Sequence, residues 1–161
     1  MEDGVPVGDY SLMSDSEFFD SFIKSVNAIK ICIHGDTSCF GKSKVTALNG
    51  SSWDDNYIHL NSLVTGDGIL YSWSSNVDGS MCANKGLNSE DIQNCIGRFY
   101  VDVNGGTPPN TIGRDIFLFM AINGKGIVPA GAAVRNSECS KVGIGSTCAA
   151  KVLREGAINY Y

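Results

Sequence analysis

The 161-residue sequence lacks a long hydrophobic run. No uninterrupted apolar stretch reaches the roughly 18 residues that suggest a membrane-spanning helix. A secretory signal is lacking as well, because Met1-Glu2-Asp3-Gly4 is acidic and offers no basic leader. We therefore expect any anchor or export signal to lie outside this sequence.

Basic charge is scarce. Twelve Lys and Arg residues stand against seventeen Asp and Glu residues, so the formal net charge is −5 and the pI is near 4.8. Nucleic acids and anionic lipids bind to basic patches, and no such patch is evident. We therefore expect neither of them as a partner.

The sequence also has no cysteine or histidine motif for a metal or a redox site. None of its six cysteines has Cys-x-x-Cys spacing, and His34 and His59 have no ligand-like neighbour. The even number suits disulfides, which would indicate the periplasm, the cell surface or the extracellular space. Bridges between sequence neighbours would close loops of about 8 to 14 residues, although six cysteines allow about fifteen pairings. The predicted disulfide residues are Cys32, Cys39, Cys82, Cys95, Cys139 and Cys148.

Disulfides and a missing export signal are at odds in one chain. The simplest explanation is that this sequence is a piece of a longer exported protein, with Met1 standing where a targeting segment was removed. Residues 14–161, of which many are apolar, can bury one core and are expected to form a single domain. Residues 1–13 are a weakly patterned extension or the remainder of a truncated helix.

Catalytic motifs are missing too. Gly143-Ile144-Gly145-Ser146 is too short for a dinucleotide fingerprint and lies between two cysteines. A Cys–His nucleophile would need a free thiol, which a complete set of disulfides removes. We therefore expect that the protein is not an enzyme.

A capping box and helical periodicity predict one long helix near the start. Ser14 and Glu17 are spaced so that each side chain can bond a backbone N–H at a helix start. Apolar residues follow at helical spacing and extend the predicted helix to about Lys30. They are Phe18, Phe22, Val26 and Ile29, flanked by Phe19 and Ile23.

Alternating apolar residues and turn signals predict an antiparallel sheet. Residues 57–60 and 68–73 read as strands of a hairpin or meander around a turn at residues 65–68. The dipeptide Asn123-Gly124 favours a type I′ turn between strands at residues 116–122 and 126–128. The predicted class is α+β, with the N-terminal helix packed on the antiparallel β-sheet and the loops stapled by disulfides.

The loop at residues 102–115 is rich in Gly, Pro and side-chain oxygens. Calcium requires such hard oxygen ligands, although Gly106 and Gly113 stand where an EF-hand would place ligands. Alternatively, the same side chains cap turns by bonding backbone N–H groups, with Asp115 pairing with Arg114 or with a turn amide. We expect no required cofactor and retain calcium as a candidate. Its candidate ligands are Asp102, Asn104, the Gly106 carbonyl, Asn110 and Asp115.

Four stretches carry a resemblance to a known family. The most specific comprises Tyr100-Val101-Asp102-Val103-Asn104-Gly105, Pro109-Asn110, Gly113-Arg114-Asp115 and Phe117-Leu118-Phe119, running on to Pro129-Ala130-Gly131. The others are residues 14–32, residues 63–73 and residues 148–161. In these stretches the chain resembles the globular part of type IV pilin-like proteins, a group that comprises pilins and the pseudopilins of type II secretion.

The resemblance implies both a fold and a function. A pilin-like head is one helix packed on an antiparallel sheet, carried on a long hydrophobic helix that anchors the full-length precursor in the inner membrane. The implied function is a non-enzymatic structural subunit of an exported bacterial type IV pilus-like or type II secretion filament, packed against identical or homologous subunits. Some pseudopilin heads bind calcium near the sheet, which implies the same for Asp102, Asn104 and Asp115.

A second hypothesis is a secreted module that binds a carbohydrate or a surface ligand. Trp53 and Trp73 would then stack on the ligand, whereas the competing interpretation places both in the core or in sheet packing. The gene upstream of Glu2 discriminates between the two functions. A leader followed by about 20 apolar residues favours the filament, and a cleavable signal peptide favours the module.

Overall fold

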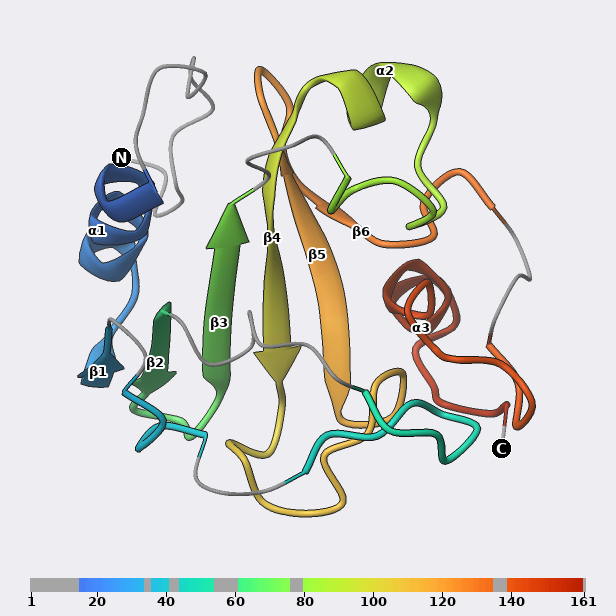
Figure 1. Cartoon of the computed structure of the whole chain (residues 1–161), viewed down its shortest axis with the longest axis horizontal. Coiled ribbons are helices and arrows are strands. Elements are labelled where there is room, and N and C mark those ends of the chain that lie inside the picture. The colour runs from blue at the N-terminus through green and yellow to red at the C-terminus, as the bar shows by residue number, and fades with distance from the viewer. Residues whose placement is uncertain are drawn as a thin grey trace.

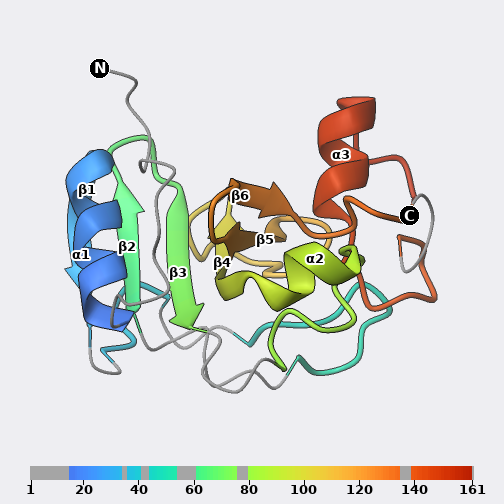
Figure 2. The same ribbon diagram turned by 90° about the horizontal axis from the view of Figure 1, so that it is seen from above.

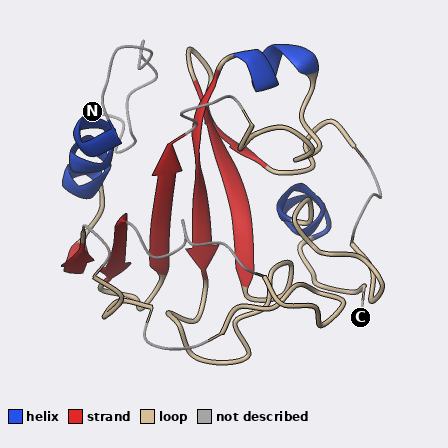
Figure 3. Ribbon diagram, viewed as in Figure 1, coloured by secondary structure: helices blue, strands red, loops and turns tan. Residues whose placement is uncertain are grey.

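The computed structural model describes residues 15–33, 36–40, 44–53, 61–75, 80–134 and 139–160. The predicted features at residues 1–14, His34 and residues 57–60 lie outside these ranges. Within them the chain forms three helices and six strands (Figures 1 and 3). In chain order they are α1 (Asp15–Ser25), β1 (Ala28–Cys32), β2 (Asn61–Thr65), β3 (Leu70–Ser75), α2 (Ser89–Gln93), β4 (Cys95–Asp102), β5 (Ile116–Ile122), β6 (Gly126–Pro129) and α3 (Ala149–Glu155).

The strands form one antiparallel sheet in the order β1-β2-β3-β4-β5-β6. Each strand pairs with the one before it, so the sheet is a meander with β1 and β6 at its edges. Figures 1 and 2 place α1 and α3 at opposite ends of the sheet. The predicted α+β class, antiparallel sheet and disulfides are confirmed.

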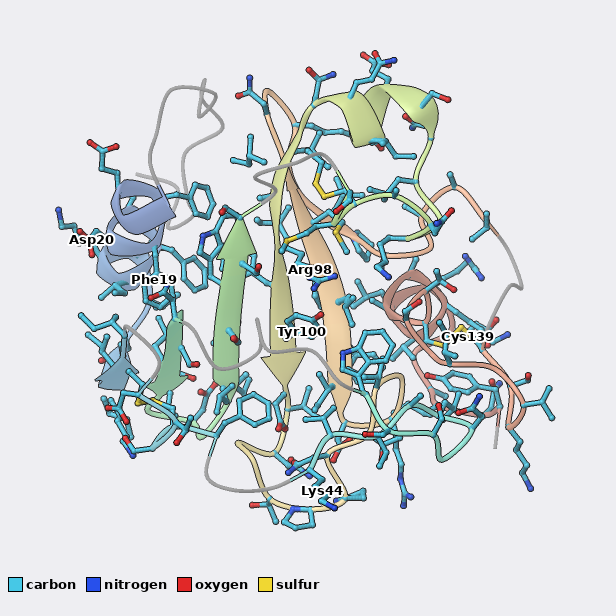
Figure 4. All side chains as sticks on the ribbon, viewed as in Figure 1. Phe19, Asp20, Lys44, Arg98, Tyr100 and Cys139 are labelled. Atoms are coloured by element: carbon cyan, nitrogen blue, oxygen red, sulfur yellow. A yellow bond between two sulfur atoms is a disulfide. The ribbon has the colours of Figure 1, made fainter. Side chains whose placement is uncertain are left out.

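Alternation along the strands divides the buried residues between the two faces of the sheet. On β4, Phe99 belongs to an aromatic cluster with residues of α1, whereas Tyr100 belongs to a larger cluster with Leu118 and Met120. Figure 4 shows Arg98 and Tyr100 on this second face of β4. The guanidinium carbon of Arg98 lies 5.0 Å from the centre of the Tyr100 ring.

The apolar face of α1 contacts the aromatic residues of the sheet. The rings of Phe18 and Trp73 stack with centroids 4.3 Å apart, and those of Phe22 and Phe99 are 4.5 Å apart. Asp20 points away from the sheet (Figure 4). Trp73 is only 1% exposed, so the core interpretation of this residue is confirmed.

The helix ends five residues earlier than predicted, because α1 stops at Ser25 and not near Lys30. A turn follows in which the Ala28 N–H donates to the Val26 carbonyl at 2.9 Å. Isoleucines then enter β1, where Ile31 pairs with Leu63 of β2. Their β-branched side chains favour a strand once a partner strand is available.

The two hairpins predicted from the sequence differ in detail from those in the structure. The turn between β2 and β3 is confirmed by a 2.9 Å bond from the Gly68 N–H to the Thr65 carbonyl. The β5–β6 hairpin is also confirmed, but its turn is not type I′. Gly124 has a φ of 72° while Asn123 has no positive φ, a type II pattern, since type I′ needs positive φ at both positions.

Three disulfides join cysteines that are neighbours in the sequence. They lie at the end of β1, at the start of β4 and just before α3. Such bridges indicate an oxidising, extracytoplasmic environment. None of the helices among the described residues is long and apolar enough to span a bilayer. The pairs are Cys32–Cys39, Cys82–Cys95 and Cys139–Cys148.

Candidate functional site

The loop at residues 102–115 connects β4 to β5 and packs against the turn between β2 and β3. Gly105 has a φ of 68°, and a Cβ there would collide with the Gly68 carbonyl oxygen. Asn110 follows a cis Pro108–Pro109 bond and has a φ of 47°, which asparagine tolerates better than most residues. Glycine and asparagine therefore permit the tight path that the loop follows.

Asp102, at the end of β4, caps the first turn of this loop. Its side chain is completely buried, and its two carboxylate oxygens accept the N–H groups of Asn104 and Gly106, each at 3.0 Å. These bonds satisfy two backbone donors that would otherwise lie unpaired in the loop.

Asp115 caps the other side of the loop. It is 5% exposed and accepts the N–H groups of Asn110, at 2.8 Å, and of Thr111. The Asn104 side-chain amide also donates to it at 3.3 Å. Asp115 therefore pairs with backbone amides of the turn, which is one of the two alternatives that the sequence left open.

The five candidate ligands come together in the fold. The Asn110 side-chain amide donates to the Gly106 carbonyl at 3.2 Å, which links the two halves of the loop. The Oδ1 of Asn110 is buried and has no hydrogen-bond partner in the described part of the chain. A hard oxygen acceptor thus lies within a loop that already contains two carboxylates.

The electrostatics of the loop are unfavourable for ionisation of Asp102. Burial raises the pKa of the Asp102 carboxyl, and the charge of Asp115 raises it further. The N–H groups of Asn104 and Gly106 act in the opposite direction. A bound cation would offset the repulsion between the carboxylates and use the lone pairs that the backbone leaves free. Among the described residues, however, no group of three or more His, Cys, Asp or Glu is placed to hold a metal.

Distant segments bind this loop through contacts that the sequence did not indicate. The hydroxyl groups of Thr46 and Thr111 lie 3.1 Å apart, and the Thr46 N–H donates to the Asn110 carbonyl at 3.0 Å. Near the C-terminus, the Tyr160 hydroxyl donates to the Gly113 carbonyl. No local pattern in the sequence indicates such contacts, because the partners are 47 to 65 residues apart.

A second polar site that the sequence did not indicate lies between α2 and the β5–β6 turn. The Nζ of Lys125 donates to both oxygens of the buried Asp91 carboxylate, at 2.7 and 2.8 Å. The Asn88 amide donates to the same carboxylate at 3.1 Å. This ion pair borders a hollow of about 450 Å³ and joins α2 to the hairpin.

The two tryptophans do not form a shared ligand surface. Trp73 is buried against α1, whereas Trp53 is half-buried and packs on the cluster of the other sheet face. The Lys85 ammonium lies 5.8 Å from the centre of the Trp53 ring. A ligand could therefore not stack on both residues together.

Comparison of the chain with protein-family models, with curated proteins and with solved structures yields no match.

Proposed function

We propose that this chain is the globular head of a filament subunit, a type IV pilin or a type II secretion pseudopilin. The observation that carries the proposal is the segment of residues 100–131, the most specific part of the resemblance. This segment comprises the end of β4, the loop that follows and the β5–β6 hairpin. In the proposed fold, α1 packs on the sheet as the helix of a pilin-like head does.

The physical properties of the chain suit this role. A fibre subunit works outside the cytoplasm without chaperones, where disulfides and tightly capped loops resist unfolding. The proposed work is packing against identical or homologous subunits, which needs no catalytic group. The full-length precursor would be anchored in the inner membrane, and the head would lie in the periplasm, at the cell surface or outside the cell.

The gene and the cell surface together test this proposal. We expect a short basic leader and about 20 apolar residues encoded upstream of Glu2. We also expect peptides of this chain in filaments sheared from producing cells, detected by mass spectrometry. A cleavable signal peptide, together with a soluble secreted chain, would contradict the filament role and favour a ligand-binding module.

We propose in addition that one calcium ion binds the loop at residues 102–115. The residues fit the ion by chemistry, because Asp102, Asp115 and the orphaned Oδ1 of Asn110 are hard oxygen donors. Asn104 and the Gly106 carbonyl complete the candidate set. The ion would offset the repulsion of two buried carboxylates and brace the connection between β4 and β5.

A thermal melt tests the calcium proposal. With a dissociation constant of about 10⁻⁴ M, calcium at about 10 mM would stabilise the fold by about 2.7 kcal/mol relative to chelator. Asp102→Asn should abolish this shift, while Asp67→Asn, at an exposed turn, should preserve it. If the melting temperature of the native chain is the same in calcium and in chelator, the loop is held by its capped turns alone.

A further inference from the structure

Two apolar surfaces of the described chain remain exposed. The first, here the isoleucine edge, consists of Ile29, Ile31 and Ile33, which are 67%, 47% and 46% exposed. Ile31 alternates along the edge strand β1 with Lys30 and with Cys32, whose sulfur bonds Cys39 on the opposite face. Ile29 lies at a register shift between Ala28 and Lys30, and Ile33 directly follows the strand. The isoleucine edge is therefore a projecting row of side chains.

The second surface is a hollow in the sheet, here the apolar groove. It has a volume of about 290 Å³. This volume is at the lower limit of about 300 Å³ for small-molecule pockets, so the groove suits a few side chains better than a large ligand. The groove is lined by Phe22, Tyr71, Phe99, Val101, Phe119 and Ile127.

We propose that the isoleucine edge of one copy of this chain docks into the apolar groove of a second copy. The register places Ile31, in the middle of the isoleucine edge, on the same face of the sheet as the groove, because Ile31 is opposite Leu63, which is opposite Tyr71. One surface projects and the other is hollow, so each fits the other better than it fits itself. The contact is therefore heterologous and can repeat from copy to copy without closing.

The distribution of charge on the chain is consistent with a second copy of the chain as the occupant of the apolar groove. The chain carries a formal net charge of −5, so most of its surfaces repel another copy. In contrast, β1 contains no acidic residue, and among the described residues none of the side chains that line the groove is charged. The residues of β1 and the lining of the groove can therefore meet without a carboxylate of either set between them, while Asp67 lies beside the groove, near Tyr71.

The buried area indicates how strong this contact is. The three isoleucines expose on the order of 200 Å² of apolar surface, whereas a stable interface buries about 800 Å² on each partner. The contact alone is thus too small for a tight dimer. The proposed contact therefore rests on the proposed filament role, because a fibre holds neighbouring subunits at a high local concentration, at which a weak contact can form.

Sedimentation velocity on the isolated chain tests the contact. We expect the weight-average sedimentation coefficient to rise between about 10 μM and 1 mM protein. Ile31→Asp, at the edge, and Ile127→Asp, at the 44% exposed rim of the groove, should each remain monomeric. Val142→Asp is the matched control, because Val142 is 86% exposed and lies in neither surface.

Mixing the two variants separates a heterologous contact from a symmetric one. Ile31→Asp keeps an intact groove and Ile127→Asp keeps an intact edge, so an equimolar mixture should form dimers and nothing longer. Self-association of Ile127→Asp alone, or a mixture that stays monomeric, would overturn the proposal. So would a native chain that remains monomeric at about 1 mM. Circular dichroism verifies folding, and Ile→Ser variants replace any Asp variant that unfolds.

Failure of the edge-to-groove contact can be distinguished from failure of the proposed filament role. A head that associates as described but is missing from sheared filaments would contradict the filament role alone. A subunit that is found in filaments, and whose Ile31→Asp variant assembles normally, would contradict the edge-to-groove contact alone.

Discussion

Gly131, just after β6, shows how a single residue can depend on a distant one. Its φ is 90°, and a Cβ at this position would collide with the carbonyl oxygen of Thr147. Gly50 has a similar φ of 84° but faces open space. An alanine at Gly50 would meet only the unfavourable backbone conformation, whereas an alanine at Gly131 would also collide with Thr147.

Gly131→Ala should lower the free energy of unfolding by about 2–4 kcal/mol, as measured by urea denaturation. Gly50→Ala bears the cost of the left-handed conformation alone and should lower it by about 1–2 kcal/mol. Equal effects of the two substitutions would show that Thr147 can move away from the added methyl group.

Tyr71 gives a prediction about alkaline stability. Burial raises the pKa of its phenol above the ordinary value of 10.0, and the nearby Asp67 carboxylate raises it further. The folded state therefore holds the proton more tightly than the unfolded state. The stabilising contribution is present below pH 10.0 and is lost as the pH rises through the pKa of the folded state.

Tyr71→Phe should remove this contribution to alkaline unfolding. Urea denaturation between pH 9 and about pH 12 should show a shallower loss of stability in the variant than in the native chain. Tyr160→Phe is not a suitable control, because it would also remove the hydrogen bond from the Tyr160 hydroxyl to the Gly113 carbonyl. Phenolate absorbance of the folded native chain provides an independent check of the raised pKa.

The start of the sheet shows where local patterns mislead at the level of elements. Val26 and Ile29 continue the helical spacing of Phe18 and Phe22, which is why the sequence predicts a helix to about Lys30. Pairing of β1 with β2 overrides this pattern, because the ladder bonds and the Cys32–Cys39 bridge favour an extended chain. Ile29 is left 67% exposed and contributes to the isoleucine edge.

The ion pair of Lys125 and Asp91 ties α2 to the β5–β6 hairpin. Lys125→Met leaves a carboxylate that is 5% exposed without its cation, so it should cost about 2–3 kcal/mol of stability. Lys151→Met is the matched control, because it removes an i,i+4 pair with Glu155 on α3 and should cost about 0.5 kcal/mol or less.

Chemical denaturation of both lysine variants measures this difference, and hydrogen exchange at α2 locates it. We expect faster exchange in α2 for Lys125→Met and unchanged exchange there for Lys151→Met. Equal stability of the two variants would mean that Asn88 and solvent satisfy Asp91 without Lys125.

At the scale of the whole molecule, the disulfides close short loops at three separate places. The Cys32–Cys39 bridge spans 7 residues, and both sulfurs are buried. On the chain-entropy argument, its removal should cost roughly 2–3 kcal/mol, because the unfolded chain regains the freedom of the loop.

The double substitution Cys32→Ala and Cys39→Ala tests this value in urea denaturation. Reductant should destabilise the native chain further, because it also opens the other two bridges. A double variant as stable as the native chain would show that β1 is held by its pairing with β2 and not by the bridge.

Local chemistry along the chain was enough to predict much of this molecule. Alternating apolar residues and glycine turns indicated the hairpin of β5 and β6, and an even number of cysteines indicated disulfides. The turn-capping role predicted for the oxygen-bearing residues of the loop at 102–115 is likewise seen at Asp102 and Asp115, whereas calcium binding there stays a prediction. Turn, strand and disulfide signals depend on residue types and short spacings, which are visible in a linear sequence.

Long-range packing determined the rest. Where α1 ends and how Thr46 and Tyr160 hold the loop depend on segments that meet after folding. The same holds for the isoleucine edge and the apolar groove, because the sheet register sets which side chains are exposed. These features arise from contacts between distant residues, whose free energies no local pattern records.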